Sequence, residues 1–69
     1  MTLWATVLEV RNSSLLVLDC RTCQQVIVFA QNAWRFSIGD CVRIEYNGVM
    51  TLSIPPQISA MRICRVRCC

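Results

Sequence analysis

The feature that most constrains the fold of this chain is a series of short apolar segments separated by polar, turn-forming residues. Five such segments, rich in Val, Ile and Leu, span residues 3–10, 15–20, 25–30, 41–46 and 58–66. β-branched residues favour strands, and each segment is shorter than an ordinary helix. The pattern therefore predicts five strands, with a bulge or a doubly buried stretch near Val7 and Leu8, where strict alternation breaks.

The fourth segment and its continuation carry the clearest local signals. Residues 41–46 alternate between apolar and polar side chains, as a strand with one buried face requires. Asn47-Gly48 follows at once and is a strong signal for a tight hairpin turn, after which residues 50–54 continue in an extended form. Pro55-Pro56 cannot donate hydrogen bonds to a ladder, so the last strand is expected to begin after these prolines.

Residues 31–36 lack strand periodicity and predict a single helical turn or an irregular loop between the third and fourth strands. A small five-stranded sheet removes its exposed edges by closing. We therefore predict an all-β fold, a small five-stranded OB-like Greek-key barrel, with an SH3-like barrel as the alternative. The barrel domain is expected to span residues 1–64, and residues 65–69 form a short tail rich in Arg and Cys.

Composition narrows the class of protein. Apolar residues make up 55% of the 69 residues and charged residues 16%, which is the reverse of a disordered chain. No apolar run approaches the ~20 residues that a membrane-spanning helix needs, and no signal peptide is recognisable. We expect a cytoplasmic protein from the sequence as written, with secretion as the alternative.

Two strings in the second half of the chain carry a family resemblance. Residues 39–48 read GDCVRIEYNG and residues 50–60 read MTLSIPPQISA, of which SIPPQISA is the most specific part. The chain resembles the small β-barrel domains of Firmicutes that are grouped as the DUF3221 family. The resemblance implies an OB-like fold and a bacterial source. That family has no agreed activity, so the resemblance implies no site residue.

Six cysteines in so short a chain leave several chemistries open. They are Cys20, Cys23, Cys41, Cys64, Cys68 and Cys69. In a reducing compartment they would be free thiols, and in a secreted protein they would form disulfides. Only one C-x-x-C pair, Cys20 and Cys23, is present and there is no histidine, so the pattern gives little support for a four-ligand zinc site. We predict no metal and no cofactor.

The basic and aromatic residues supply the candidate ligand-binding set. All seven basic residues are arginines, and the net charge is +3. Trp34, Arg35, Arg43 and Arg62 are the candidate ligand-binding residues, because arginine contacts phosphate and aromatic rings stack on bases. The alternative is that Phe29, Phe36 and Tyr46 fill the barrel, while the arginines pair with acidic residues or face water.

The residues do not favour an enzyme. There is no histidine to act as a general base, and the four acidic residues are scattered. We expect a non-enzymatic binding or protein-interaction module whose partner is an unknown protein or small ligand. A single-stranded nucleic-acid-binding domain is one alternative, which the modest charge does not favour, and a secreted disulfide-stabilised effector is another. The high apolar content also makes a homodimer a candidate, with Trp34 at the contact.

Overall fold

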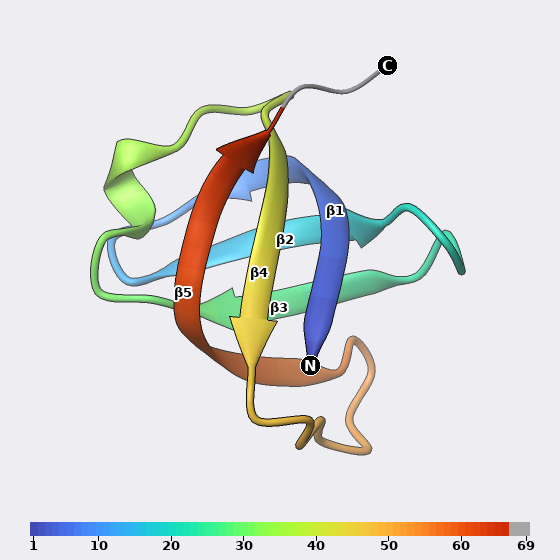
Figure 1. The fold of residues 1–69 in the computed structure, drawn as a ribbon. Coiled ribbons are helices and arrows are strands. Elements are labelled where there is room, and N and C mark those ends of the chain that lie inside the picture. The colour runs from blue at the N-terminus through green and yellow to red at the C-terminus, as the bar shows by residue number, and fades with distance from the viewer. Residues whose placement is uncertain (67–69) are drawn as a thin grey trace.

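Five strands close into a barrel in which each strand pairs with two others (Figure 1). The structure is a computed structural model that describes residues 1–66. The strands are β1 (Thr2–Val10), β2 (Ser14–Asp19), β3 (Gln25–Phe29), β4 (Cys41–Tyr46) and β5 (Gln57–Val66), and a 3-10 helix, η1 (Ala33–Arg35), lies between β3 and β4. The predicted small five-stranded all-β barrel is confirmed. Strand β5 ends at Val66, as predicted for the fifth segment, and so includes the first two residues of the predicted tail.

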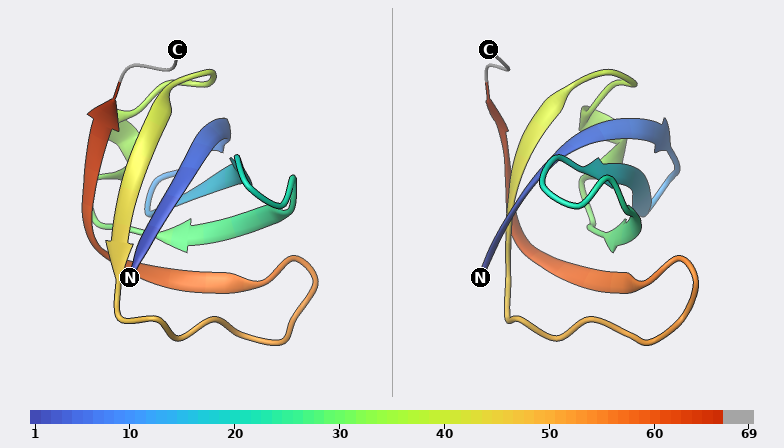
Figure 2. Two further views of the ribbon diagram at one scale, coloured as in Figure 1. Left: turned by 45° about the vertical axis from the view of Figure 1, so that its right-hand side comes forward. Right: turned by 90° about the vertical axis from the view of Figure 1, so that its right-hand side faces the viewer.

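The order of strands around the barrel is β1-β2-β3-β5-β4, because β5 inserts between β3 and β4. Strand β5 bends strongly, so that its first residues lie along β3 and the rest lie along β4 (Figures 1 and 2). The β3–β5 pair is parallel and the other four pairs are antiparallel. A parallel pair needs a crossover connection, which η1 and β4 provide here. The barrel is therefore not a simple meander.

The core consists of the inward-facing residues of all five strands. In β4 the alternation that the sequence predicts is confirmed, because Val42, Ile44 and Tyr46 are buried. The largest fully buried side chains are branched aliphatic ones: Val7, Leu15, Val17, Val26, Val28, Val42 and Ile44. Such side chains are stiff and pack well on a pleated surface. Burying them supplies most of the stabilisation that a domain of this size can obtain.

Two irregularities adjust how the strands face the core. The register of β1 against β2 shifts between Val7 and Glu9, so the predicted bulge at the start of the barrel is confirmed. A second shift lies between Glu45 and Tyr46 of β4, opposite Met61 of β5. Because of this shift, Ala60 and Ile63 both pack against the core, although they are three residues apart on one strand.

The tight hairpin predicted at Asn47-Gly48 is wrong. The Asn47 side chain accepts a hydrogen bond from the Val49 amide at 3.0 Å and Gly48 has a φ of +92°, so the chain does turn there. No strand returns directly, however, because the next strand, β5, begins only at Gln57, pairs first with β3 and reaches β4 at Ala60. Residues 47–56 instead form a long loop that ends at the prolines. The cis peptide between Ile54 and Pro55 lies in this loop, just before β5 begins.

The segment between β3 and β4 closes one end of the barrel. As predicted, it contains a single turn of helix, and it buries Ala33 and Phe36 against the core. Phe36 and Tyr46 therefore fill the barrel, whereas Phe29 is 43% exposed, which contradicts the reading that all three rings fill it. Within residues 1–66, η1 is far too short to cross a membrane, and no longer apolar helix is found.

Candidate ligand-binding groove

A groove of about 740 Å³ lies between the η1 segment and the middle of β5. One wall comes from the end of β3 and the η1 segment, and the other comes from β5. Its lining residues are Ser13, Phe29, Ala30, Gln31, Asn32, Arg35, Ala60, Met61, Arg62 and Ile63. Figure 1 shows the two walls at the left of the barrel, where the segment drawn in green passes β5. We take this groove as the candidate site.

The groove exists because β3 and β5 separate. Their parallel pairing ends at Phe29 and Ser59, and from Ala60 onwards the described part of β5 pairs with β4 alone. After Phe29 the chain leaves the sheet, since the Ala30 amide donates to the Ser13 carbonyl at 3.0 Å. The backbone of β5 in this stretch has one edge without a neighbouring strand. Backbone and side-chain groups on that edge can therefore contact a ligand.

Two of the predicted residues, Arg35 and Arg62, line opposite walls of the groove. The Arg35 guanidinium lies over the Trp34 ring, with 5.4 Å from Cζ to the ring centroid. Within residues 1–66 the ion pairs are Arg11–Glu9 and Arg65–Asp40, so neither groove arginine has an acidic partner there. The lining residues include no Asp or Glu. The groove therefore presents two guanidinium groups that can bind an anion.

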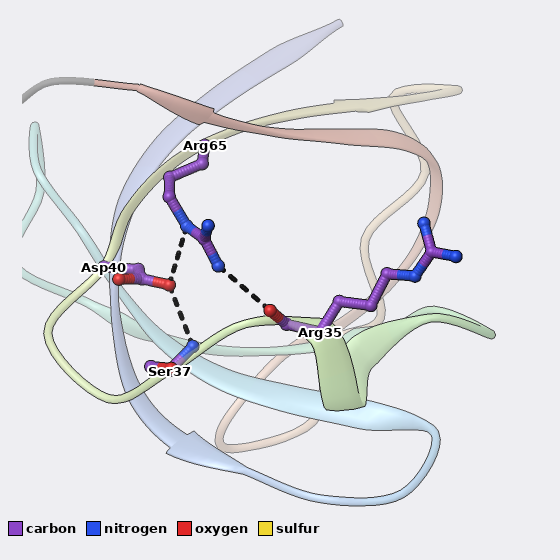
Figure 3. A network of polar contacts seen from close by, with 4 residues as sticks. All are labelled: Arg35, Ser37, Asp40 and Arg65. Carbon is purple, nitrogen blue, oxygen red and sulfur yellow. Dashed lines mark hydrogen bonds and ion pairs between the residues drawn. The ribbon is translucent and has the colours of Figure 1, made fainter.

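The backbone that carries Arg35 is held in place by a network around Asp40 (Figure 3). Arg65 of β5 donates from Nε to the Asp40 carboxylate at 3.0 Å and from Nη2 to the Arg35 carbonyl at 2.9 Å. The same Asp40 oxygen accepts from the Ser37 amide at 2.8 Å. Figure 3 shows the side chain of Arg35 extending away from this network. Arg65 thus positions the η1 segment and leaves the Arg35 guanidinium available to a ligand.

An exposed aromatic ring, Phe29, lies at the centre of the candidate site. It lines the groove and also a smaller hollow of about 190 Å³, whose other lining residues are Asn47, Val49, Thr51, Gln57, Ile58 and Ser59. Residues 57–59 of β5 border the smaller hollow, and residues 60–63 border the groove. The smaller hollow and the groove therefore lie one after the other along β5. A flat group that enters the groove can therefore meet the face or edge of Phe29.

The structure places Arg43 elsewhere, so the predicted four-residue set is not one site. Arg43 lies on β4 opposite Trp4 of β1 and Cys64 of β5, and it does not line the groove. Its guanidinium lies 6.0 Å from the centroid of the Trp4 ring. The Nε atom is buried without a hydrogen-bond partner within residues 1–66. Two wall residues, Phe29 and Met61, were not among the predicted ligand-binding residues. Phe29 ends an apolar run that is typical of a core strand, and Met61 carries no binding signal in the sequence.

The cysteines fall in different environments. Cys20 and Cys23 are exposed free thiols in the turn between β2 and β3, and Cys64 is a half-buried free thiol on β5. Cys41, at the start of β4, is disulfide-bonded. Cys68 and Cys69 lie outside the described residues. Within residues 1–66, no three Cys, Asp, Glu or His side chains gather closely enough to hold a metal ion.

No family model matches the chain, and no curated protein or solved structure matches it either. The resemblance to the DUF3221 family therefore stays a prediction. The homodimer with Trp34 at the contact also stays a prediction. Trp34 is 65% exposed, so it is available for such a contact.

Proposed function

We propose that the protein is a non-enzymatic binding module of the OB type, and that its ligand lies in the groove between η1 and β5. The strand order and the parallel β3–β5 pair support the OB assignment over an SH3-like barrel. In OB domains, the face of strands 2 and 3 and the loops that follow strands 1 and 4 bind oligonucleotides. The groove takes Phe29 of β3 and Ser13 of the β1–β2 turn from that region. Fold alone does not define the ligand, which has to come from the chemistry of the groove.

The observation that carries the proposal is that Arg35 and Arg62 face one groove without an acidic partner. Two guanidinium groups on opposite walls favour a ligand with more than one negative charge. Glu45 lies opposite Arg62 on β4 and reduces the local positive potential without forming an ion pair. The groove therefore suits weak, salt-sensitive binding of an extended anion.

Among anionic ligands, single-stranded nucleic acid fits the groove best. Phe29 is exposed between the groove and the smaller hollow, and Trp34 lies beside Arg35. Exposed aromatic rings next to arginines bind bases by stacking and phosphates by charge, whatever the base sequence. This combination raises the nucleic-acid alternative above a protein or small-molecule partner. The free thiols of Cys20, Cys23 and Cys64 give no support to a fully disulfide-stabilised effector.

Binding of a fluorescent oligothymidylate, measured by anisotropy at several salt concentrations, tests the proposal. Two phosphate contacts predict that the logarithm of the association constant falls with the logarithm of salt concentration with a slope of about −1.4. An uncharged analogue of the same bases should bind more weakly at low salt. A flat titration with the oligothymidylate at low salt contradicts the nucleic-acid proposal. Binding of a non-nucleic polyanion with equal affinity would retain the anion site but remove the role of base stacking.

A further inference from the structure

The turn between β2 and β3 holds two exposed thiols that the proposed ligand groove does not use. Cys20 and Cys23 are both free and exposed, and neither lines the groove or the smaller hollow. The turn projects from the right-hand side of the barrel in Figure 1, whereas η1 and β5, which line the groove, lie on the left. These two exposed thiols are a pair of nucleophilic groups that the binding proposal leaves unexplained.

The backbone of the turn brings the two cysteines together. The Cys23 amide donates to the Asp19 carbonyl at 2.9 Å, which closes one turn of α-helical type. In such a turn, residues three apart have Cα atoms ~5 Å from each other. A disulfide requires a Cα separation of about 4.4–6.8 Å. The two cysteines can therefore be joined without unfolding the hairpin.

The conformation of Cys23 gives an independent sign that its side chain is used. Cys23 has a φ of +58°, and it is the one non-glycine residue with a positive φ within residues 1–66. Such a position ordinarily holds Gly or Asn, and other residues are strained there by about 1–3 kcal/mol. A cysteine at this position destabilises the turn relative to the common residues. What it supplies instead is a thiol beside Cys20.

Hydrogen bonds hold the turn in this shape. The Asp19 amide donates to the Gln24 carbonyl at 2.8 Å, and the Asp19 side chain accepts from the Arg21 amide at 2.8 Å. The Cys20 amide donates to the Trp4 carbonyl at 2.9 Å, which fastens the turn to β1. Arg21 lies between the two cysteines in sequence, and its guanidinium has no acidic partner within residues 1–66. Its charge favours the approach of an anionic disulfide reagent.

We propose that Cys20 and Cys23 form a site for thiol–disulfide exchange with a small anionic disulfide such as glutathione disulfide. One protein thiolate attacks the reagent, forms a mixed disulfide and releases one reduced thiol. The second protein thiolate then attacks the protein sulfur of that mixed disulfide, forms the Cys20–Cys23 disulfide and releases the second thiol. The protein loses two electrons and two protons, and the reagent gains them. An excess of the reduced thiol reverses both steps.

The arginines of the chain make this bond easy to detect. Trypsin cleaves after Arg11, Arg21 and Arg35, so Cys20 falls in peptide 12–21 and Cys23 falls in peptide 22–35. Full-length protein is equilibrated in glutathione buffers of graded ratio, quenched with an alkylating reagent, denatured and digested without reductant. We expect peptides 12–21 and 22–35 to appear as one linked species in oxidising buffers and to separate after reduction. The linked fraction should decrease steadily as the reduced glutathione is raised.

Matched variants show which two cysteines form the disulfide in the linked peptides. Cys64→Ser should give the same linked peptides in the same buffers as the unaltered protein, since Cys64 lies half-buried on β5. Cys20→Ser should give no linked species and leave Cys23 as a mixed disulfide with glutathione. The proposal fails if both cysteines accumulate mixed disulfides without linking to each other. It also fails if peptide 12–21 links instead to the peptide that contains Cys64, or to a second chain.

Discussion

Arg65 and Asp40 join the last strand of the barrel to the segment that closes it. Arg65 Nε lies 3.0 Å from Asp40 Oδ2, and the two residues are 25 positions apart in sequence. The Arg65 guanidinium also lies over the Phe36 ring, 5.6 Å from Cζ to the centroid. One side chain thus contacts a carboxylate and a backbone carbonyl, both drawn in Figure 3, and also a ring of the same segment. The contact fixes the wall of the groove that carries Arg35.

Replacing Arg65 should loosen that wall. We expect Arg65→Ala to lower the free energy of unfolding by about 1 kcal/mol, because the side chain is more than half exposed and its ion pair is screened by water. Arg65→Lys should recover part of the loss, since it keeps the charge but not the forked donor geometry. Urea denaturation followed by Trp fluorescence measures the change.

Arg11→Ala is the matched control for this substitution. Arg11 pairs with Glu9 at 3.3 Å, two residues away on the same hairpin, and both side chains are about half exposed. This pair joins no distant segments, so its loss should change the free energy of unfolding by less than about 0.5 kcal/mol. Equal urea midpoints for Arg65→Ala and the unaltered protein would show that the Asp40 contact does not stabilise the barrel.

Removing one methyl group from the centre of the core should lower the stability of the barrel. Ile44 is 0% exposed on β4, so Ile44→Val should cost about 1 kcal/mol and leave the barrel folded. Leu52 is of similar size but 101% exposed in the loop before β5, so Leu52→Ala should change stability by less than about 0.5 kcal/mol. Thermal unfolding by circular dichroism compares the two. A larger effect at Leu52 would mean that the loop packs against something in solution.

Much of the barrel could be predicted because the residues of one strand show in their own sequence which of its faces is buried. In β4 every second residue is buried, and the pattern Val42, Ile44, Tyr46 shows this directly in the sequence. Pairing partners are not local, however. Asn47-Gly48 has the chemistry of a tight turn, but the strand that returns beside β4 is β5, which pairs with β3 first and reaches β4 only at Ala60. That pairing depends on β3 and β5 and not on residues near the turn.

The candidate site was predicted less well than the fold, for a similar reason. Arg35 and Arg62 were chosen for their chemistry, and they line one groove only because β3 and β5 separate after Phe29 and Ser59. Phe29 reads as a core residue in an apolar run, yet strand alternation directs it outward beside buried Val28. Because residues 26–29 are all apolar, the sequence carries no alternation that shows which face of β3 is buried. Arg43 has the same chemistry as Arg62 but lies in a different part of the sheet.

The strained residue in the β2–β3 turn gives a stability prediction under reducing conditions. Cys23→Asn should raise the free energy of unfolding by roughly 0.5–1 kcal/mol, because Asn adopts positive φ at lower cost than other non-glycine residues. Cys20→Ser, at the other end of the turn and without a positive φ, should leave it unchanged within about 0.5 kcal/mol. Chemical denaturation with excess reductant measures both. A destabilised Cys23→Asn protein would mean that the thiol makes a favourable contact in the reduced turn.

The groove arginines should determine how binding of an oligonucleotide depends on salt. Arg35→Ala and Arg62→Ala should each reduce the magnitude of the salt slope by about 0.7, the contribution of one phosphate contact on a single strand. Arg35→Ala spares the Arg65 contact, which uses the Arg35 carbonyl. Arg43→Ala and Arg11→Ala, outside the groove, should keep the full slope. Equal slopes in all four variants would place the ligand elsewhere on the barrel.

Phe29 should affect the affinity without affecting that slope. Phe29→Leu keeps an apolar side chain of similar bulk at the end of β3 but removes the flat ring, and loss of one stacked base costs about 1–3 kcal/mol. We therefore expect at least about fivefold weaker binding of oligothymidylate at every salt concentration, with the slope unchanged. Anisotropy titrations across the same salt series measure both quantities for one variant. A change in slope together with unchanged affinity at low salt would show that Phe29 shapes the arginine walls and does not stack on a base.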